Sequence, residues 1–125
     1  MIVGVGLDVV ETERIARALA LHGRRFEERV YTAAELAECA ERADRAQALA
    51  GRFAAKEAFL KALGTGSAHG VSFREVEVVR EHGGTPALRV TGSAAAEVRR
   101  KGVRQLHVSL SHQPGLAAAV VILEG

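Results

Sequence analysis

The sequence is poor in the residues that several classes of protein depend on. Its 125 residues include one cysteine, no tryptophan, one tyrosine and four phenylalanines. Because Cys39 is the lone cysteine, no disulfide framework can form, and it has no partner at metal-ligand spacing. We therefore interpret Cys39 as a small core residue of a helix.

Charge and aromatic content argue against a nucleic-acid-binding protein. The formal net charge of +2 is too small to indicate neutralisation of a phosphate backbone. The few aromatic rings offer little surface on which bases could stack. We expect no nucleic-acid partner.

Long apolar runs are also lacking. The longest, residues 116–123, is far too short to cross a bilayer. The N-terminal segment has neither the basic stretch nor the cleavage site of a secretory signal. These absences predict a cytoplasmic protein with no membrane partner.

What the chain does contain is typical of an ordinary globular protein. Apolar residues make up 48% of it and charged residues 26%. A chain of this length can bury about two thirds of its unfolded surface. We expect residues 1–125 to form a single domain around one core.

Residue patterns predict an α+β fold. A buried strand is expected over residues 2–10, and helices over 12–22, from a capping box at Thr32, and over 44–63. The second half predicts a hairpin, a short helix capped by Ser93 and two final strands. These last segments lie at residues 76–80, 87–90, 93–102, 106–110 and 116–123. The expected architecture is a small antiparallel sheet packed with a long central helix.

The first strand carries two kinds of residue on its two faces. Glycine at positions 4 and 6 shares a face with Asp8, because side chains alternate along a strand. Something therefore packs very close to this face, beside one carboxylate. The opposite face carries four large apolar residues: Val3, Val5, Leu7 and Val9.

Residues 49–63 predict a helix with almost no solvent-facing side. At about 100° per residue, Lys56 falls inside the apolar stripe and Glu57 at its edge. One interpretation is structural: Glu57 pairs with Lys61, and Lys56 extends its aliphatic stem outward. The other is functional: Asp8 and Glu57 converge on a hard cation such as Mg²⁺. Lys61 would then neutralise the phosphate charge that the metal does not neutralise.

The run Gly64-Thr65-Gly66 follows this helix directly. Its backbone amides and hydroxyl are suited to a phosphate or pantetheine group. Gly64 is equally typical of a helix C-cap. The chain has no P-loop pattern, so the run by itself indicates no nucleotide site.

The segment 107–112 alternates in polarity. His107, Ser109 and Ser111 share one face, which indicates either a ligand wall or a solvated strand face. Basic residues also gather early in the chain, which favours an acidic partner or simply a solvated helix face. These basic residues are Arg14, Arg17, Arg24 and Arg25.

Three motifs in order make the sequence resemble a known family, the holo-acyl-carrier-protein synthases of the phosphopantetheinyl transferase superfamily. The likeness covers nearly the whole chain. The motifs are Gly4-Val5-Gly6-Leu7-Asp8 with Glu13-Arg14-Ile15, Arg52-Phe53-Ala54-Ala55-Lys56-Glu57-Ala58-Phe59 continuing to Lys61 and Gly64-Thr65-Gly66, and His107-Val108-Ser109-Leu110-Ser111-His112.

The resemblance implies a reaction and its partners. The 4'-phosphopantetheine arm of coenzyme A passes to a serine of an apo acyl carrier protein, and adenosine 3',5'-bisphosphate leaves. It implies a phosphopantetheinyl-transferase-like fold and a homotrimer with active sites between subunits. It also implies Mg²⁺ held by Asp8 and Glu57. The implied coenzyme A contacts are Lys61, Gly64, Thr65, Gly66, His107 and Ser109, and the implied carrier contacts are Arg14, Arg17 and Arg25.

One residue departs from the family pattern. Gln113 stands where several relatives carry an acid after the second histidine, so His112 lacks the carboxylate neighbour of those relatives. The serine proton has three candidate acceptors: His112, Glu57 and a metal-bound water. Two other functions stay open, a different Mg²⁺-dependent enzyme acting on a nucleotide-like diphosphate and a non-catalytic trimeric module for acidic partners.

Overall fold

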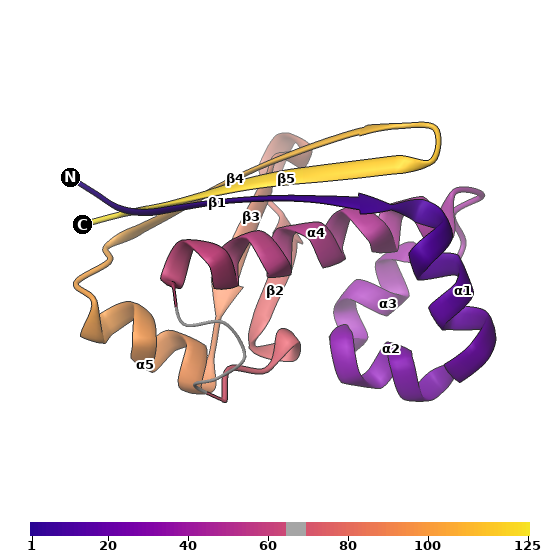
Figure 1. Ribbon diagram of the computed structural model, residues 1–125, viewed down its shortest axis with the longest axis horizontal. Coiled ribbons are helices and arrows are strands. Elements are labelled where there is room, and N and C mark those ends of the chain that lie inside the picture. Colours follow the sequence, from indigo (N-terminus) through magenta and orange to yellow (C-terminus); the bar gives the residue numbers. More distant parts are fainter. Residues whose placement is uncertain (65–69) are drawn as a thin grey trace.

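Helix α4, Arg45–Leu63, lies at the centre of the protein. The computed structural model describes residues 1–64 and 70–125. A three-stranded sheet covers one side of α4, shorter helices lie on the other side, and a hairpin passes behind α4 in this view (Figure 1). No helix in these two ranges is both long and apolar enough to span a membrane.

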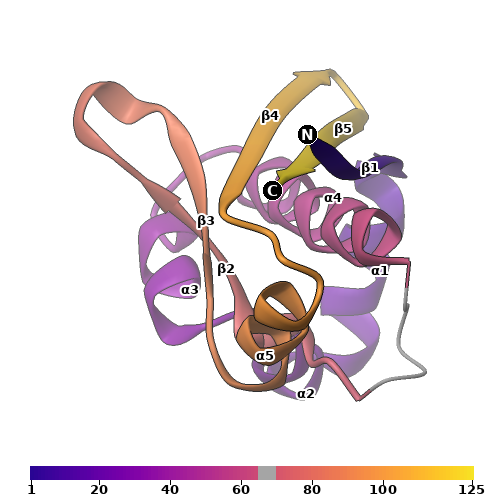
Figure 2. The same ribbon diagram turned by 90° about the vertical axis from the view of Figure 1, so that its left-hand side faces the viewer.

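The three-stranded sheet is antiparallel throughout. Its order is β1-β5-β4, formed by β1 (Ile2–Glu11), β5 (Leu116–Glu124) and β4 (Gln105–Gln113). A second sheet pairs β2 (Val76–Arg80) with β3 (Pro86–Val90), on the side of α4 away from β1 (Figure 2). The two chain ends lie together, since the Met1 amino group donates to the Gly125 carbonyl at 3.1 Å. A small antiparallel sheet packed with a long central helix is confirmed.

The remaining helices are short. They are α1 (Thr12–His22), α2 (Arg24–Val30), α3 (Ala33–Cys39), η2 (Phe73–Glu75), η3 (His82–Gly84) and α5 (Gly92–Arg100). The Thr32 capping box at the start of α3 is present, and Cys39 is fully buried in the core, both as expected.

Two local expectations were wrong. Helix α2 begins directly after Gly23, where we expected no helix, although Phe26 and Val30 stand at the i,i+4 spacing of a helix facing the core. Helix α5 begins at Gly92 with Thr91 as its N-cap. The Ser93 hydroxyl binds a side chain of η2 and caps no helix end.

Strand β1 lies almost against the backbone of α4. A Cβ atom added at Gly4 would overlap the carbonyl of Ala62, and one at Gly6 would overlap that of Ala58. Both glycines are therefore required by the close approach of strand and helix. The expectation that something packs very close to this face is confirmed.

The other face of β1 is open, contrary to the expected buried strand. Val5 is 56% exposed and Leu7 61% exposed. The reason is that α4 covers only the inner face of the three-stranded sheet, and no described element covers the outer face. The chain thus leaves a row of apolar side chains in solvent.

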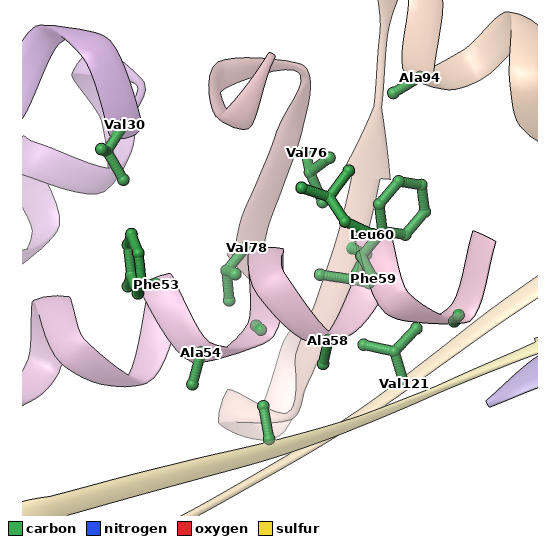
Figure 3. Packing of buried hydrophobic residues seen from close by; sticks show 14 of the residues in the cluster. Val30, Phe53, Ala54, Ala58, Phe59, Leu60, Val76, Val78, Ala94 and Val121 are labelled. Atoms are coloured by element: carbon green, nitrogen blue, oxygen red, sulfur yellow. The ribbon is translucent and has the colours of Figure 1, made fainter. Parts of the chain in front are cut away.

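The core surrounds α4 on nearly every side. Phe53 and Phe59 are buried along with the alanines between them. Figure 3 shows Val76 and Val78 of β2 on one side of the helix and Val121 of β5 on the other. A helix packed this way must rely on small residues, which explains its alanine content.

Candidate functional site

Asp8 and Lys61 bring strand β1 and helix α4 together in an ion pair. Lys61 Nζ lies 3.0 Å from Asp8 Oδ1 and donates to the Leu7 carbonyl at 3.0 Å. The Asp8 side chain is 14% exposed. The structural alternative paired Lys61 with Glu57, but here Lys61 bonds to strand β1 instead.

The second oxygen of Asp8 is buried without a hydrogen-bond partner among the described residues. A carboxylate oxygen in that state costs free energy unless something else binds it. Asp8 is therefore held in place by one oxygen and leaves the other available. A carboxylate oxygen in this state can serve as a cation ligand.

Glu57 shares this region with Asp8. Burial raises the pKa of Glu57, and the charge of Asp8 raises it further, while Arg14 and Lys61 act in the opposite direction. Two carboxylates close enough to interact repel each other unless a cation lies nearby. Glu57 is half-buried on α4, one turn beyond Phe53.

The pair fits a hard divalent cation. Mg²⁺ takes one or two protein carboxylates and completes its coordination with waters and substrate phosphate oxygens. In the described ranges no cluster of three or more metal-ligating side chains occurs. A site with two carboxylates, one of them with an unpartnered oxygen, therefore suits Mg²⁺ better than Zn²⁺.

Arg14 of α1 lies at the edge of the same region. Its guanidinium sits 5.3 Å from the centroid of the Phe53 ring. Such cation–π contacts hold an exposed arginine in one orientation. Arg14 thus connects the surface of α1 to the helix that carries Glu57.

Gly64 ends α4 in a left-handed conformation, with φ of 76°. Its amide donates to the Leu60 carbonyl at 3.1 Å, so it acts as a C-cap. Lys101 donates from its ammonium group to the Leu63 carbonyl at the same helix end. Thr65 and Gly66 lie outside the described residues.

His107, Ser109 and Ser111 are exposed on the outer face of β4, so the alternation read from the sequence is confirmed. His107 Nε2 lies 2.9 Å from Glu124 Oε1. This face points away from α4, whereas Asp8 points toward it, and β5 lies between the two strands. One copy of the chain does not bring His107 to Asp8.

His112 lies in a different place, a cavity of about 60 Å³ beside the start of α4. We call this cavity the arginine pocket, because three arginines line it together with His112. Arg52 is 2% exposed, and its Nε is buried without a hydrogen bond in the described part of the chain. The arginines are Arg42, Arg52 and Arg80.

The pocket escaped sequence reasoning because its arginines come from three separate segments. The sequence does offer one indication, because Arg52 is a permanent charge within an apolar stretch of α4, residues 48–55. Two acids already contact these arginines, Asp44 in the pocket lining and Glu38 outside it. Arg42 bonds Asp44 through Nε at 2.9 Å and Nη2 at 3.0 Å, and Arg52 Nη2 lies 3.1 Å from Glu38 Oε1.

The early arginines form an exposed surface along α1 and α2. Arg17 lies 3.6 Å from Glu13, with both side chains largely in solvent. Arg25 lines an open cavity of about 300 Å³ together with His22, Phe26 and Arg29. The surface is basic and has one apolar ring in it, which suits an acidic partner.

Known proteins match the whole length of this chain. A family model described as the 4'-phosphopantetheinyl transferase superfamily matches residues 4–121. A holo-acyl-carrier-protein synthase of Methylobacterium radiotolerans is 52% identical over 128 residues, covering 99% of this chain and 94% of the relative. One of Koribacter versatilis is 46% identical over 124 residues, covering 99% of each.

Solved structures agree in fold. The crystal structure of the Neisseria meningitidis synthase has a TM-score of 0.92 at 34% identity and covers 100% of both chains. That of the Helicobacter pylori synthase, in complex with coenzyme A, has a TM-score of 0.84 at 28% identity. It covers 96% of this chain and 99% of that one.

Proposed function

Because the chain belongs to the 4'-phosphopantetheinyl transferase superfamily, we propose that it transfers the phosphopantetheine arm of coenzyme A to an apo acyl carrier protein. The acceptor is a carrier serine, and adenosine 3',5'-bisphosphate leaves. The observation that carries the proposal is the group of Asp8, Glu57 and Lys61 on the motifs shared with the family. Residues 1–125 would act as one transferase domain in the cytoplasm.

Asp8 and Glu57 would hold Mg²⁺. The unpartnered oxygen of Asp8 and the raised pKa of Glu57 both support this assignment. Mg²⁺, when bound, neutralises charge on the coenzyme A diphosphate. Lys61 would donate from its ammonium group to phosphate oxygens, in place of its present bonds to Asp8 and the Leu7 carbonyl.

The reaction exchanges one phosphorus–oxygen bond for another. The serine oxygen bonds to the β-phosphorus, the bond from that phosphorus to the bridging oxygen breaks, and adenosine bisphosphate carries the bridging oxygen away. The serine proton needs an acceptor. Glu57 is the candidate in the same chain, because burial and the charge of Asp8 both raise the pKa of its carboxyl group. His112 would have to act from a neighbouring copy.

The arginine pocket supports coenzyme A as the donor. Coenzyme A carries a diphosphate and a separate phosphate monoester at the ribose 3' position. If the carboxylates and Lys61 take the diphosphate, the monoester needs its own cationic site. Arg52 and Glu57 are five residues apart on α4, so they point about 140° apart around the helix. One coenzyme A would therefore use the carboxylates of one copy and the arginine pocket of another.

The exposed face of β1 supports such an assembly. A homotrimer with active sites between subunits would cover the open apolar side chains Val3, Val5, Leu7 and Val9. It would also bring His107 and Ser109, on the same outer sheet face, to the donor molecule. Gly64, Thr65 and Gly66 would contact its phosphate or pantetheine portion.

Arg14, Arg17 and Arg25 would receive the carrier protein. Their exposed guanidinium groups offer charge to an acidic helix. Arg14 is the member of this surface that also lies near Glu57. Carrier docking would therefore take place beside the carboxylates, which is where the serine must react.

Intact-mass analysis tests the proposal. An apo acyl carrier protein incubated with coenzyme A, Mg²⁺ and this protein should gain the mass of one phosphopantetheine group. Without Mg²⁺, or with Asp8→Asn, no gain is expected. An enzyme that hydrolyses nucleotide-like diphosphates would consume its substrate and leave the carrier unmodified, and a non-catalytic module would do neither.

A further inference from the structure

Glu38 of α3 contacts two of the three arginines of the arginine pocket. Its Oε1 lies 3.1 Å from Arg52 Nη2 and 4.0 Å from Arg80 Nε. The Glu38 side chain is 41% exposed, whereas that of Arg52 is 2% exposed. Glu38 therefore approaches from the surface and reaches a guanidinium that solvent does not.

Arg52 depends on this contact for its counter-charge. Its Nη1 donates to the Ala48 carbonyl at 3.2 Å. Its Nε and Nη2 are buried without a hydrogen bond among the described residues, so Glu38 is close enough for an ion pair but poorly aligned. A buried guanidinium with imperfect partners retains the capacity to bind a better-placed anion.

The other two arginines have partners of different kinds. Arg80 donates from Nη1 to the Gly84 carbonyl at 2.9 Å and is partly exposed. Arg42 makes two hydrogen bonds to Asp44. The three guanidinium groups and their two carboxylate partners together carry one net positive charge. Removing Glu38 would double it.

We propose that Glu38 is an internal counter-anion that lowers the affinity of the arginine pocket for a phosphate monoester. The inference rests on the proposed function, in which this pocket takes the 3'-phosphate of coenzyme A. An entering phosphate must share Arg52 and Arg80 with Glu38, and the two anions repel each other. Coenzyme A and adenosine 3',5'-bisphosphate carry the same 3'-phosphate monoester. Weaker binding of this monoester therefore favours release of the bisphosphate as much as it disfavours binding of coenzyme A.

A positioning role for Glu38 predicts the opposite sign. If the carboxylate only holds Arg52 in the orientation that binds phosphate, its removal weakens binding. If it competes with phosphate, its removal strengthens binding. Glu38→Gln separates the two because the amide keeps the size and one acceptor oxygen but loses the charge.

The matched control is Glu41→Gln. Glu41 is exposed in the turn after α3, and its substitution changes the net charge of the protein by the same amount. Calorimetric titration with adenosine 3',5'-bisphosphate should show a Kd roughly three- to tenfold lower in Glu38→Gln than in wild type. Glu41→Gln should stay within about twofold, and moderate salt should reduce its effect more than that of Glu38→Gln.

A double-mutant cycle tests whether Glu38 affects bisphosphate binding through its contact with Arg80. Arg80→Gln removes one partner of Glu38 at a partly exposed position, so the fold should tolerate it. In the Arg80→Gln background the gain from Glu38→Gln should shrink, because one of the two competing contacts is already gone. A gain of unchanged size would show that Glu38 acts through the overall field and not through the pocket, which overturns the proposal.

The outcomes separate this inference from the proposed function. If wild type modifies a carrier protein but Glu38→Gln leaves the Kd unchanged or raises it, the counter-anion role is wrong and the transferase stands. If wild type modifies no carrier yet Glu38→Gln tightens bisphosphate binding, the transferase is wrong and the counter-anion stands. If no variant binds the bisphosphate, the counter-anion role is wrong, and the carrier assay alone decides the transferase.

Discussion

Lys56 and Glu35 form an ion pair that is completely enclosed by protein. Lys56 Nζ lies 2.8 Å from Glu35 Oε1, and neither side chain is exposed. The ammonium group also donates to the Phe73 carbonyl at 2.9 Å and the Val76 carbonyl at 2.7 Å. Glu35 in turn accepts from the Val78 amide at 2.8 Å. One pair therefore joins α3, α4 and β2.

Removing one member of this pair should be costly. Lys56→Met leaves Glu35 as an unpaired buried charge, and we expect the free energy of unfolding to fall by about 3–5 kcal/mol. Urea denaturation followed by circular dichroism measures it. Arg17→Met, which removes a solvent-exposed pair, should cost less than about 1 kcal/mol. Equal losses in the two variants would contradict the assigned role.

Close approach of β1 and α4 gives a second stability prediction. Gly6→Ala places a methyl group against the Ala58 carbonyl, so strand and helix must separate. We expect a loss of roughly 1–3 kcal/mol in unfolding free energy. Gly51→Ala is the control, since nothing lies within 4 Å of its Cβ position and alanine favours a helix. That variant should be neutral or slightly more stable.

How far the sequence predicts this fold depends on the range of the interactions. The Thr32 capping box and the Gly64 C-cap are local, and both follow from the residue pattern. The glycines of β1 also reveal a close neighbour, because an absent side chain has few other causes in a strand. Such features need only a few adjacent residues to be recognised.

Other features depend on partners far along the chain. Lys56 has its partner 21 residues away, so the sequence left open whether its stem reached solvent. It does not: Lys56 is 0% exposed. The arginine pocket likewise joins residues from α4, β4 and the segments at Arg42 and Arg80. Helical periodicity places a residue on a face but does not say what covers that face.

Glu57→Gln should raise the stability of the protein while it removes transfer activity. Its pKa is raised in the folded state, so ionised Glu57 opposes folding above the unfolded pKa, about 4.3, and has no such effect below it. Without Mg²⁺ at pH 7 the variant should have a Tm about 1–3 °C above wild type. The difference should vanish below about pH 4, and transfer to the carrier should be nearly abolished.

Asp8→Asn is the companion variant. It should also nearly abolish transfer, because a neutral amide is a poor ligand for Mg²⁺. Its stability should not rise in the same way, since Asp8 loses its ion pair with Lys61. Full transfer activity in either variant would show that the carboxylate pair is not the metal site of the transferase.

Arg14→Glu tests docking of the carrier. The reversed charge should raise the KM for the carrier protein by at least about tenfold and change that for coenzyme A much less. Arg99→Glu, at an exposed position of α5 far from α1 and α2 (Figure 1), serves as the control for net charge. Increasing salt should weaken wild-type transfer by screening. Equal effects on the KM values of both substrates would show that Arg14 does not contact the carrier protein.

His112→Ala distinguishes a phosphate-binding histidine from a general base. His112 lines the arginine pocket, and Gln113 beside it has no charge with which to stabilise an imidazolium. The Gln113 carbonyl instead accepts from Gln47 Nε2 at 2.6 Å, which fixes this end of β4 to α4. We therefore expect the KM for coenzyme A to rise about three- to tenfold while kcat falls less.

A general base would give the reverse pattern. Transfer measured from pH 5 to 8 would then show kcat lowered by on the order of ten to a thousandfold, with coenzyme A binding unchanged and the histidine limb of the profile lost. Because α4 directs Arg52 and Glu57 to different sides, such a base would have to act across a subunit contact. Mixing His112→Ala with Glu57→Gln subunits tests this directly. If Glu57 of one copy and His112 of another serve the same site, the mixture should regain activity, because some of its sites then carry both residues intact. If the two residues act within one copy, the mixture should stay inactive.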